Sequence, residues 1–244
     1  MNIDDIKTIA VIGAGDMGHG IAEVALIAGY KVFLRDINQE FVDRGVGRIN
    51  ASLEKLVSKG KVPADHFEKI KTELMVPCTD LAEAVKEADL VIEAIPELMD
   101  LKKETFKAMD AAAPAHTIFA SNTSTMKITD IASATNRPEK VLGLHYFNPA
   151  VIMKLVEVIK GEKTDDETIQ IGFDFVLKNK KVPVKVHKDV PGFIVNRVQA
   201  PSGVLLGCIL DKKIADPEAV DAIFRNMGSP MGPYETMDYT GLDI

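Results

Sequence analysis

The sequence predicts an α/β fold in which helices cover both faces of a parallel sheet, followed by a smaller all-α domain. Short apolar runs without polar alternation are separated by helical patterns, which is typical of buried parallel strands; they span residues 7–12, 30–35, 90–92 and 117–120. A glycine-rich turn follows the first run, and the pattern after residue 192 is helical throughout. We therefore expect one domain over residues 1–188 and a second over residues 189–244.

The first half of the chain supplies strand and helix in alternation. A helix of small residues is expected near 17–29 and ends at Gly29, and a longer polar helix is expected over 38–60. The longer helix carries its apolar residues close to helical spacing, which predicts one buried face.

Two further strand-like runs, 141–147 and 153–159, are joined by a short loop that contains Asn148 and Pro149. A helix over 165–179 and a strand over 182–186 complete the first domain. The helical segment that follows has only about 55 residues, so alone it would bury a thin core.

Composition narrows the class of protein. The 244 residues carry a net charge of −7, and 46% are hydrophobic, so we expect a globular protein without the basic face that nucleic acids require. The two cysteines, Cys78 and Cys208, predict neither a disulfide framework nor a cysteine-ligated metal site, and they suggest a reducing compartment. No apolar run has the length of a membrane span, and the N-terminus lacks the basic region of a secretory signal. We expect a cytoplasmic protein that needs no metal and no membrane partner.

A dinucleotide-binding motif follows the first predicted strand. Residues 13–18 read Gly-Ala-Gly-Asp-Met-Gly and fit GxGxxG between a strand and a helix, so we expect Gly13, Gly15, Met17 and Gly18 to contact the cofactor. Asp36 ends the second strand, where an acid accepts hydrogen bonds from the adenine ribose. Its charge should repel a 2′-phosphate, so NAD is favoured over NADP and the domain is predicted to be Rossmann-like.

A candidate acid–base pair lies in the hairpin formed by runs 141–147 and 153–159. If the two strands pair antiparallel about Val151, His145 lies directly opposite Glu157. A carboxylate beside an imidazole fixes its tautomer and stabilises its protonated form, as a general base requires. Read from these two residues alone, a histidine that caps a strand and a solvated glutamate are the favoured interpretation.

Five motifs occur along the chain: GAGDMGHGIA, SNTS at 121–124, HYFNP at 145–149, MKLVEVI at 153–159 and PGFIVNR at 191–197. In this order and spacing they resemble the L-3-hydroxyacyl-CoA dehydrogenase family, and within it most closely the short 3-hydroxybutyryl-CoA dehydrogenases. The resemblance implies a homodimeric enzyme that oxidises L-3-hydroxyacyl-CoA reversibly with NAD. It further implies His145 as general base, Glu157 as its partner, and Ser124 and Asn196 beside the substrate oxygen. A helix cap and a polar helix residue are the plain alternatives for Ser124 and Asn196.

The resemblance also implies further contacts with the cofactor and the substrate. Glu97, Lys102 and Asn148 are expected near the nucleotide, and Ser52 and Lys59 against coenzyme A. From the residues alone, Lys59 could equally be a solvated cation at a helix C-terminus.

The chain departs from the family pattern in two places, and other functions stay open. Residues 198–204 differ from the family's usual sequence, and the chain ends where the helical domain of relatives continues, so this domain is expected to be incomplete. A dehydrogenase of another 3-hydroxyacid or of a sugar acid, and a catalytically idle NAD-binding relative such as a lens crystallin, are the alternatives.

Overall fold

The computed structural model describes residues 1–240 as two compact units. The first unit is Met1–Ile194, and the second begins at Val195. Each unit is described by itself. Within the described residues, no helix is long and apolar enough to cross a membrane.

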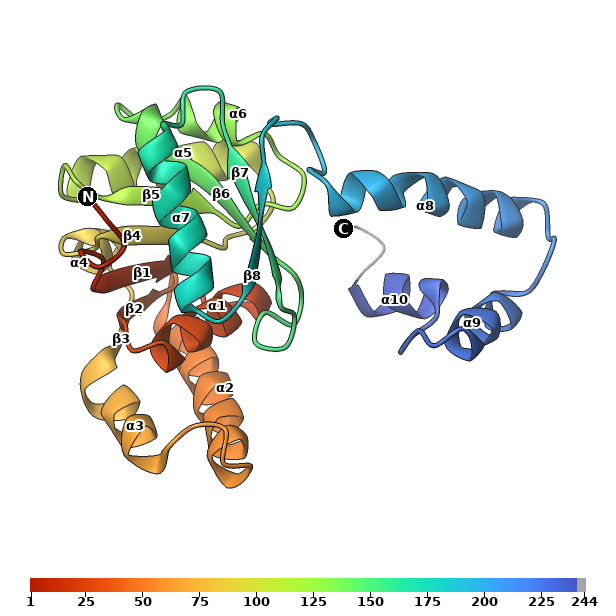
Figure 1. The fold of residues 1–244 in the computed structure, drawn as a ribbon, viewed down its shortest axis with the longest axis horizontal. Helices are drawn as coiled ribbons and strands as arrows, with labels where there is room; N and C mark the ends of the chain where they lie inside the picture. Colours follow the sequence, from red (N-terminus) through yellow and green to blue (C-terminus); the bar gives the residue numbers. More distant parts are fainter. Residues whose placement is uncertain (241–244) are drawn as a thin grey trace. The chain divides into compact units, whose positions relative to one another are not determined.

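One eight-stranded sheet forms the centre of the first unit, in the order β3-β2-β1-β4-β5-β6-β7-β8 (Figure 1). Its strands are β1 (Thr8–Ile12), β2 (Lys31–Arg35), β3 (Met75–Cys78), β4 (Leu90–Glu93), β5 (Ile118–Ser121), β6 (Val141–Tyr146), β7 (Leu155–Lys160) and β8 (Val182–Val186). The first six are parallel, β7 pairs antiparallel with β6, and β8 pairs parallel with β7. The predicted α/β class and the antiparallel hairpin are confirmed. The strand order reverses between β1 and β4, which is where doubly wound sheets bind ligands beyond the carboxyl ends of their strands.

Helices cover both faces of this sheet, as the continuous apolar strands predict. The helices α1 (Asp16–Ile27), α2 (Gln39–Ser58) and α7 (Asp166–Lys178) pack on one face around a core that includes Phe175. The helices α4 (Leu81–Val85), α5 (Met99–Ala112) and α6 (Ile128–Ala132) pack on the other around Phe106 and Phe119. Every residue of β4 and β6 is buried, because both faces of those strands are covered.

Local sequence fixes where several helices begin. The side chains of Asn38, Asp80 and Asp165 each accept a hydrogen bond from a backbone N–H in the first turn of α2, α4 and α7, respectively. Such caps satisfy donors that a helix N-terminus leaves without partners.

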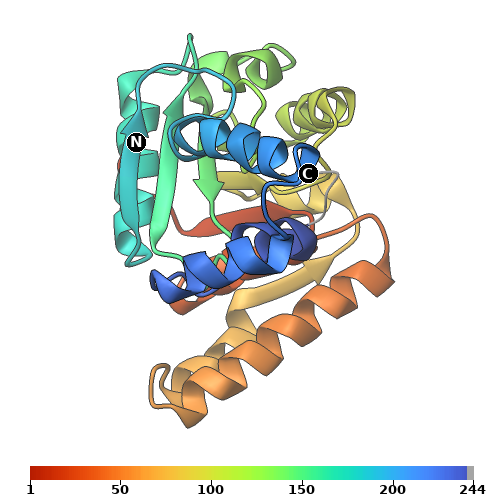
Figure 2. The same ribbon diagram turned by 90° about the vertical axis from the view of Figure 1, so that its right-hand side faces the viewer.

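Several elements of the first unit, one of them a strand, are not among the predicted elements. The strand β3 contains Pro77 and has no fully buried residue, because it lies at the edge of the sheet, where a missing N–H is tolerated. It is preceded by α3 (Ala64–Lys69) and a π-helical turn (Ile70–Leu74), and Figures 1 and 2 show α3 beside α2. The helices α4, α5 and α6 and a 3₁₀ turn (Pro138–Lys140) are also absent from the prediction. They are short or highly polar, so the helical spacing of their apolar residues is not apparent in the sequence.

The second unit consists of α8 (Val195–Asp211), α9 (Pro217–Asn226) and α10 (Pro233–Thr240). This confirms the prediction that the end of the chain forms an all-α domain. Its buried core is small and comprises Leu206, Val220 and Tyr234. The Tyr234 hydroxyl donates to the carbonyl of Leu206 over 2.8 Å. Helix begins only at Val195: Phe193 has a φ of 48°, is 2% exposed and packs in the core of the first unit. Phe193 falls within residues 189–244, where the second domain is expected, but it packs in the core of the first unit.

Candidate active site

At two positions in the turn between β1 and α1, only glycine fits, because the β-carbon of any other residue would clash with the backbone. Gly13 has a φ of 106°, and a β-carbon there would lie 2.4 Å from the carbonyl oxygen of Ala94. A β-carbon on Gly18 would lie 1.8 Å from the Gly13 carbonyl oxygen. These contacts hold the β1–α1 turn against the residues that follow β4, at the reversal point of the sheet.

The N-terminus of α1 is open toward this reversal point. Gly15 is the N-cap, and a β-carbon there would meet nothing within 4 Å among the described residues. Backbone N–H groups and the positive end of the helix dipole suit a pyrophosphate at such a position. The one acid of the first turn, Asp16, forms an ion pair with Arg48, which offsets a negative charge beside the phosphate position. Met17 is half-buried in the same turn.

Asp36 follows β2 directly and faces the same turn. Its Oδ2 accepts the N–H of Ala14 at 2.7 Å, and its Oδ1 accepts the N–H of Ile37 at 2.7 Å. The carboxylate is thereby fixed, and each oxygen keeps a lone pair for a ribose hydroxyl. The residues at this edge fit an adenine dinucleotide.

The hairpin of β6 and β7 brings His145 opposite Glu157, in the register that the sequence predicts. The Nδ1 of His145 lies 2.7 Å from Oε2 of Glu157, and the other carboxylate oxygen accepts the N–H of Ile194 at 2.9 Å. Glu157 is fully buried and His145 is 5% exposed. The rings of Phe147 and Phe193 have their centroids 4.5 and 5.8 Å from the imidazole centroid and screen it from water.

This geometry decides which imidazole nitrogen can act on a substrate. An ionised carboxylate only accepts hydrogen bonds, so the neutral imidazole carries its proton on Nδ1 and keeps a lone pair on Nε2. A group so arranged can take a proton through Nε2 while Glu157 stabilises the cation that forms.

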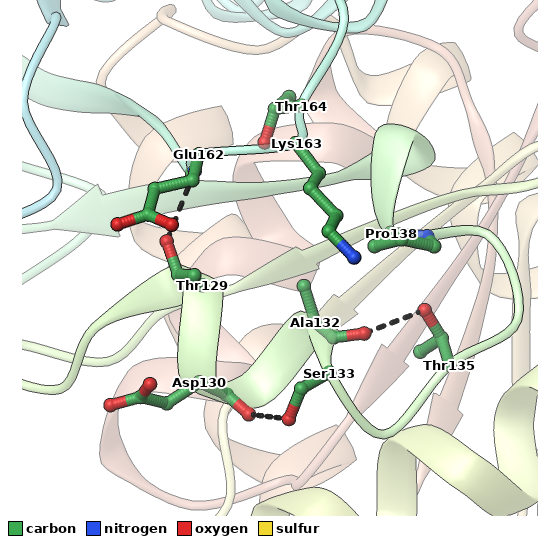
Figure 3. A pocket seen from close by; sticks show the side chains of 10 residues that line it. Thr129, Asp130, Ala132, Ser133, Thr135, Pro138, Glu162, Lys163 and Thr164 are labelled. Carbon is green, nitrogen blue, oxygen red and sulfur yellow. Dashed lines mark hydrogen bonds between the residues drawn. The ribbon is translucent and has the colours of Figure 1, made fainter.

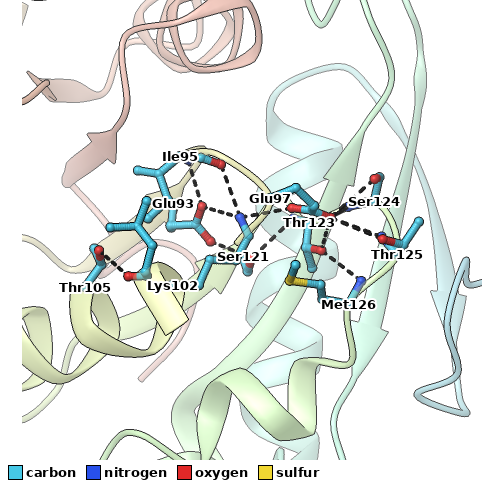
Figure 4. A network of polar contacts seen from close by, with 11 residues as sticks. Glu93, Ile95, Glu97, Lys102, Thr105, Ser121, Thr123, Ser124, Thr125 and Met126 are labelled. Carbon is cyan, nitrogen blue, oxygen red and sulfur yellow. Dashed lines mark hydrogen bonds and ion pairs between the residues drawn. The ribbon is translucent and has the colours of Figure 1, made fainter. Parts of the chain in front are cut away.

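A second polar network joins the loops that follow β4 and β5 (Figure 4). Oε1 of Glu97 accepts the hydroxyl of Thr123 at 2.5 Å and the N–H of Ser124 at 2.9 Å. The ammonium of Lys102 lies 2.7 Å from Glu93 and 3.1 Å from Glu97. Burial raises the pKa of Glu97, but the Thr123 hydroxyl, the Lys102 charge and the Ser124 N–H together lower it below its ordinary value. Glu97 is therefore ionised near neutral pH.

Comparison with known families decides the class of this site. Residues 8–190 match the NAD binding domain of 3-hydroxyacyl-CoA dehydrogenase, and residues 192–244 match the C-terminal domain of the same family. The chain belongs to the 3-hydroxyacyl-CoA dehydrogenase family. It is an NAD-dependent oxidoreductase, and NAD is its cofactor.

Relatives of this dehydrogenase are similar over nearly the whole chain. A 3-hydroxyadipyl-CoA dehydrogenase of Escherichia coli is 43% identical, over 98% of this chain and 50% of its own length. A probable 3-hydroxybutyryl-CoA dehydrogenase of Bacillus subtilis is 42% identical, over 98% of this chain and 83% of its own. The crystal structure of (S)-3-hydroxybutyryl-CoA dehydrogenase from Ralstonia eutropha is 35% identical, with a TM-score of 0.90, over 98% of this chain and 83% of that one. This chain thus spans half of the E. coli relative and most of the other two.

The remaining predicted residues of the dehydrogenase occupy different environments. Asn148 is exposed just after β6, in the loop between the strands that carry His145 and Glu157. Ser52 donates its hydroxyl to Glu23 over 2.6 Å, and Lys59 is exposed at the C-cap of α2. Asn196 belongs to α8 of the second unit, and its role stays a prediction.

Three residues near the predicted site are not among those that the sequence indicates. Glu93 ends β4, Ser121 ends β5, and Asn122 follows it. Ser121 donates to Glu93 over 2.7 Å, and the side-chain oxygen of Asn122 accepts the N–H of Tyr146 at 2.9 Å. Their position at the carboxyl ends of parallel strands is the signal that could have identified them.

A hollow of about 290 Å³ lies away from this edge, beside the start of β6 (Figure 3). Residues of α6 and of the loop after β7 line it, including Thr129, Ser133 and Lys163. The hydroxyl of Ser133 donates to the carbonyl of Asp130, and the N–H of Glu162 donates to Thr129.

Within the described residues, no group of histidine, cysteine and acidic side chains could hold a metal ion.

Proposed function

We propose that this dehydrogenase oxidises short-chain L-3-hydroxyacyl-CoA to 3-oxoacyl-CoA, reversibly, with His145 and Glu157 as its acid–base pair. The observation that carries the proposal is the 2.7 Å contact between the two side chains, both buried, at the carboxyl edge of a sheet that carries a dinucleotide motif. The chemistry of hydride transfer belongs to NAD, whose nicotinamide accepts a hydride from C3 of the substrate when bound.

The chain's own residues would handle the proton and the oxygen. The substrate hydroxyl donates to Nε2 of His145, which takes the proton as C3 is oxidised. Glu157 holds Nδ1 and offsets the positive charge that the imidazole gains. Ser124, at the end of the loop that Glu97 holds, is proposed to donate to the same substrate oxygen, with Asn196 beside it.

Contacts outside the reacting centre define the substrate and cofactor classes. We propose that Gly13, Gly15, Met17, Gly18 and Asp36 bind the adenine half of NAD and that Glu97 and Asn148 lie near its other half. Lys59, exposed at the end of α2, and Ser52 on the same helix are proposed to contact coenzyme A. The carboxylate of Asp36 opposes a 2′-phosphate, so NADPH should be a poor substrate.

The second unit is proposed to mediate a homodimer. Its exposed side chains include Val198, Val204, Leu205 and Met227, which are 72%, 69%, 65% and 78% exposed. A helical unit with so small a core gains stability by covering such a surface with a second copy. We also propose a cytoplasmic location, which fits the two free cysteines, Cys78 and Cys208.

The proposed activity is tested by following NADH absorbance with acetoacetyl-CoA and with longer 3-oxoacyl-CoA substrates. We expect the highest kcat/KM for the four-carbon thioester and weak activity for a free 3-oxo acid. Equal turnover of a free sugar acid would indicate the wider 3-hydroxyacid dehydrogenase class instead.

A further inference from the structure

A buried lysine lies against the loop that joins β6 to β7. This loop, residues 147–154, connects the two strands that carry His145 and Glu157. Lys181 lies between α7 and β8 and is 8% exposed. Removing an ammonium group from water is unfavourable unless its hydrogens find acceptors, so the contacts of this side chain show what it is buried for.

The ammonium group of Lys181 donates to the backbone of the loop. Its Nζ lies 2.5, 3.1 and 2.7 Å from the carbonyl oxygens of Ala150, Val151 and Met153, respectively. An ammonium group has three hydrogens, so each carbonyl is matched by one of them. The loop also bonds to itself, because the N–H of Met153 donates to the carbonyl of Pro149 at 2.9 Å. One side chain therefore fixes the direction of three carbonyls within four residues.

The same loop packs on the helix that follows the dinucleotide motif (Figure 1). Ala150 is 2% exposed, and a β-carbon on Gly20 of α1 would lie 3.2 Å from the β-carbon of Ala150. The N-terminus of α1 is the position that suits a pyrophosphate. The loop thus contacts the nucleotide-binding helix and is continuous with both strands of the acid–base pair.

We propose that Lys181 is a positioning residue that holds the 147–154 loop against α1, and so fixes the His145–Glu157 pair relative to the bound dinucleotide. It acts through the backbone carbonyls of the loop. This inference rests on the function proposed for His145 and Glu157.

The chemistry of the side chain explains why a lysine is needed here. Burial lowers the pKa of Lys181, and the charge of Glu23 raises it in part, which supports the protonated form. Only this form has a hydrogen for each of the three carbonyls. A methionine of similar length has none, so Lys181→Met leaves the carbonyls without these bonds, the buried carbonyl of Ala150 among them.

The first test compares Lys181→Met with Lys178→Met, a control at the end of α7 whose side chain is 42% exposed. We measure kcat with acetoacetyl-CoA at saturating NADH, and hydrogen–deuterium exchange of the 147–154 amides without ligand. We expect Lys181→Met to lower kcat at least about tenfold, because a remote misplacement of ~1 Å can cost 10²-fold. We also expect faster exchange in the loop and no change in the control. Wild-type kcat or wild-type exchange in Lys181→Met would overturn the proposal.

A second variant displaces the loop without changing any charge. Gly20→Ala pushes against Ala150, but alanine favours a helix more than glycine does, so the variant is not expected to unfold more easily. We expect kcat to fall about threefold with an undiminished urea midpoint, because the displacement is smaller. The pair Gly20→Ala/Ala150→Gly removes the added contact and should restore kcat. An unchanged kcat in Gly20→Ala would contradict a role for the packing of the loop on α1.

Failure of the proposed function has a different signature. A wild-type enzyme that binds NADH but leaves acetoacetyl-CoA unreduced would refute the proposed substrate. The exchange rates of the 147–154 amides in Lys181→Met and Lys178→Met would still decide whether Lys181 holds the loop.

Discussion

Folding buries the carboxyl group of Glu23, and burial disfavours the charged form of this group. It lies on α1, is 1% exposed, and accepts the Ser52 hydroxyl on Oε1, whereas Oε2 has no hydrogen-bond partner among the described residues. The nearby Lys181 ammonium donates to the carbonyls of Ala150, Val151 and Met153 instead. Burial raises the pKa of Glu23 from 4.5 to about 7, against smaller opposing effects of Ser52 and Lys181.

The sign of the pH effect follows from this raised pKa. Below about pH 4.5 the carboxyl is protonated in both folded and unfolded chains, and it imposes no penalty. Between 4.5 and 7 the folded chain binds more protons than the unfolded one, so stability falls as pH rises. Above 7 the full penalty applies, about 3 kcal/mol, since a tenfold change in proton affinity is about 1.4 kcal/mol.

Glu23→Gln should therefore stabilise the protein at pH 8 by up to about 3 kcal/mol and have little effect at pH 4.5. Urea unfolding midpoints at several pH values measure this difference, and Glu54→Gln, an exposed change on α2, is the matched control. If wild type and Glu23→Gln lose stability in parallel between pH 4.5 and 7, the pKa of Glu23 is not raised in the folded protein.

Three further predictions concern the cofactor, the acid–base pair and the second unit. Asp36→Ala should narrow the preference for NADH over NADPH, measured as the ratio of kcat/KM values; an unchanged ratio would show that the carboxylate does not face the ribose. Glu157→Gln should lower kcat about 10²-fold with little change in NADH affinity, because it weakens the support of the imidazolium; near-normal turnover would contradict the pairing. Val204→Glu with Leu205→Glu should shift the protein from dimer toward monomer in light scattering at micromolar concentration; a wild type that is already monomeric, near 26.6 kDa, would refute the dimer.

The features that the sequence predicts correctly are those that depend on short-range pattern. The glycine turn at 13–18 has a fixed spacing, and the hairpin register of His145 with Glu157 follows from strand alternation and a short loop. The amino-acid sequence alone therefore predicts the glycine turn between a strand and a helix, and it separately predicts that His145 lies opposite Glu157. The fold confirms both predictions. The motif alone indicates the cofactor role of the glycine turn, whereas the family resemblance is needed to prefer the catalytic interpretation of His145 and Glu157.

The parts that the sequence does not predict depend on long-range packing. A lysine amid the polar residues of α5 is indistinguishable by pattern from a solvated one, and only the sheet shows that Lys102 is buried against Glu93. Phe193 lies next to a helical segment, yet it packs into the core of the first unit, because Gly192 and a positive φ at Phe193 turn the chain before α8 begins. Edge strand β3 lacks the continuous apolar run that identifies the central strands.

The proposed reaction depends on His145, held by Glu157, to remove the proton as a 3-hydroxyacyl-CoA is oxidised with NAD. The most direct measurement compares wild type and His145→Gln in NADH oxidation by acetoacetyl-CoA, with NADH affinity determined in parallel. We predict clear activity in the wild type and a loss of kcat of ~10²–10⁴ in the variant, with unchanged NADH binding. A variant that turns over acetoacetyl-CoA at nearly the wild-type rate would show that His145 is not the general base.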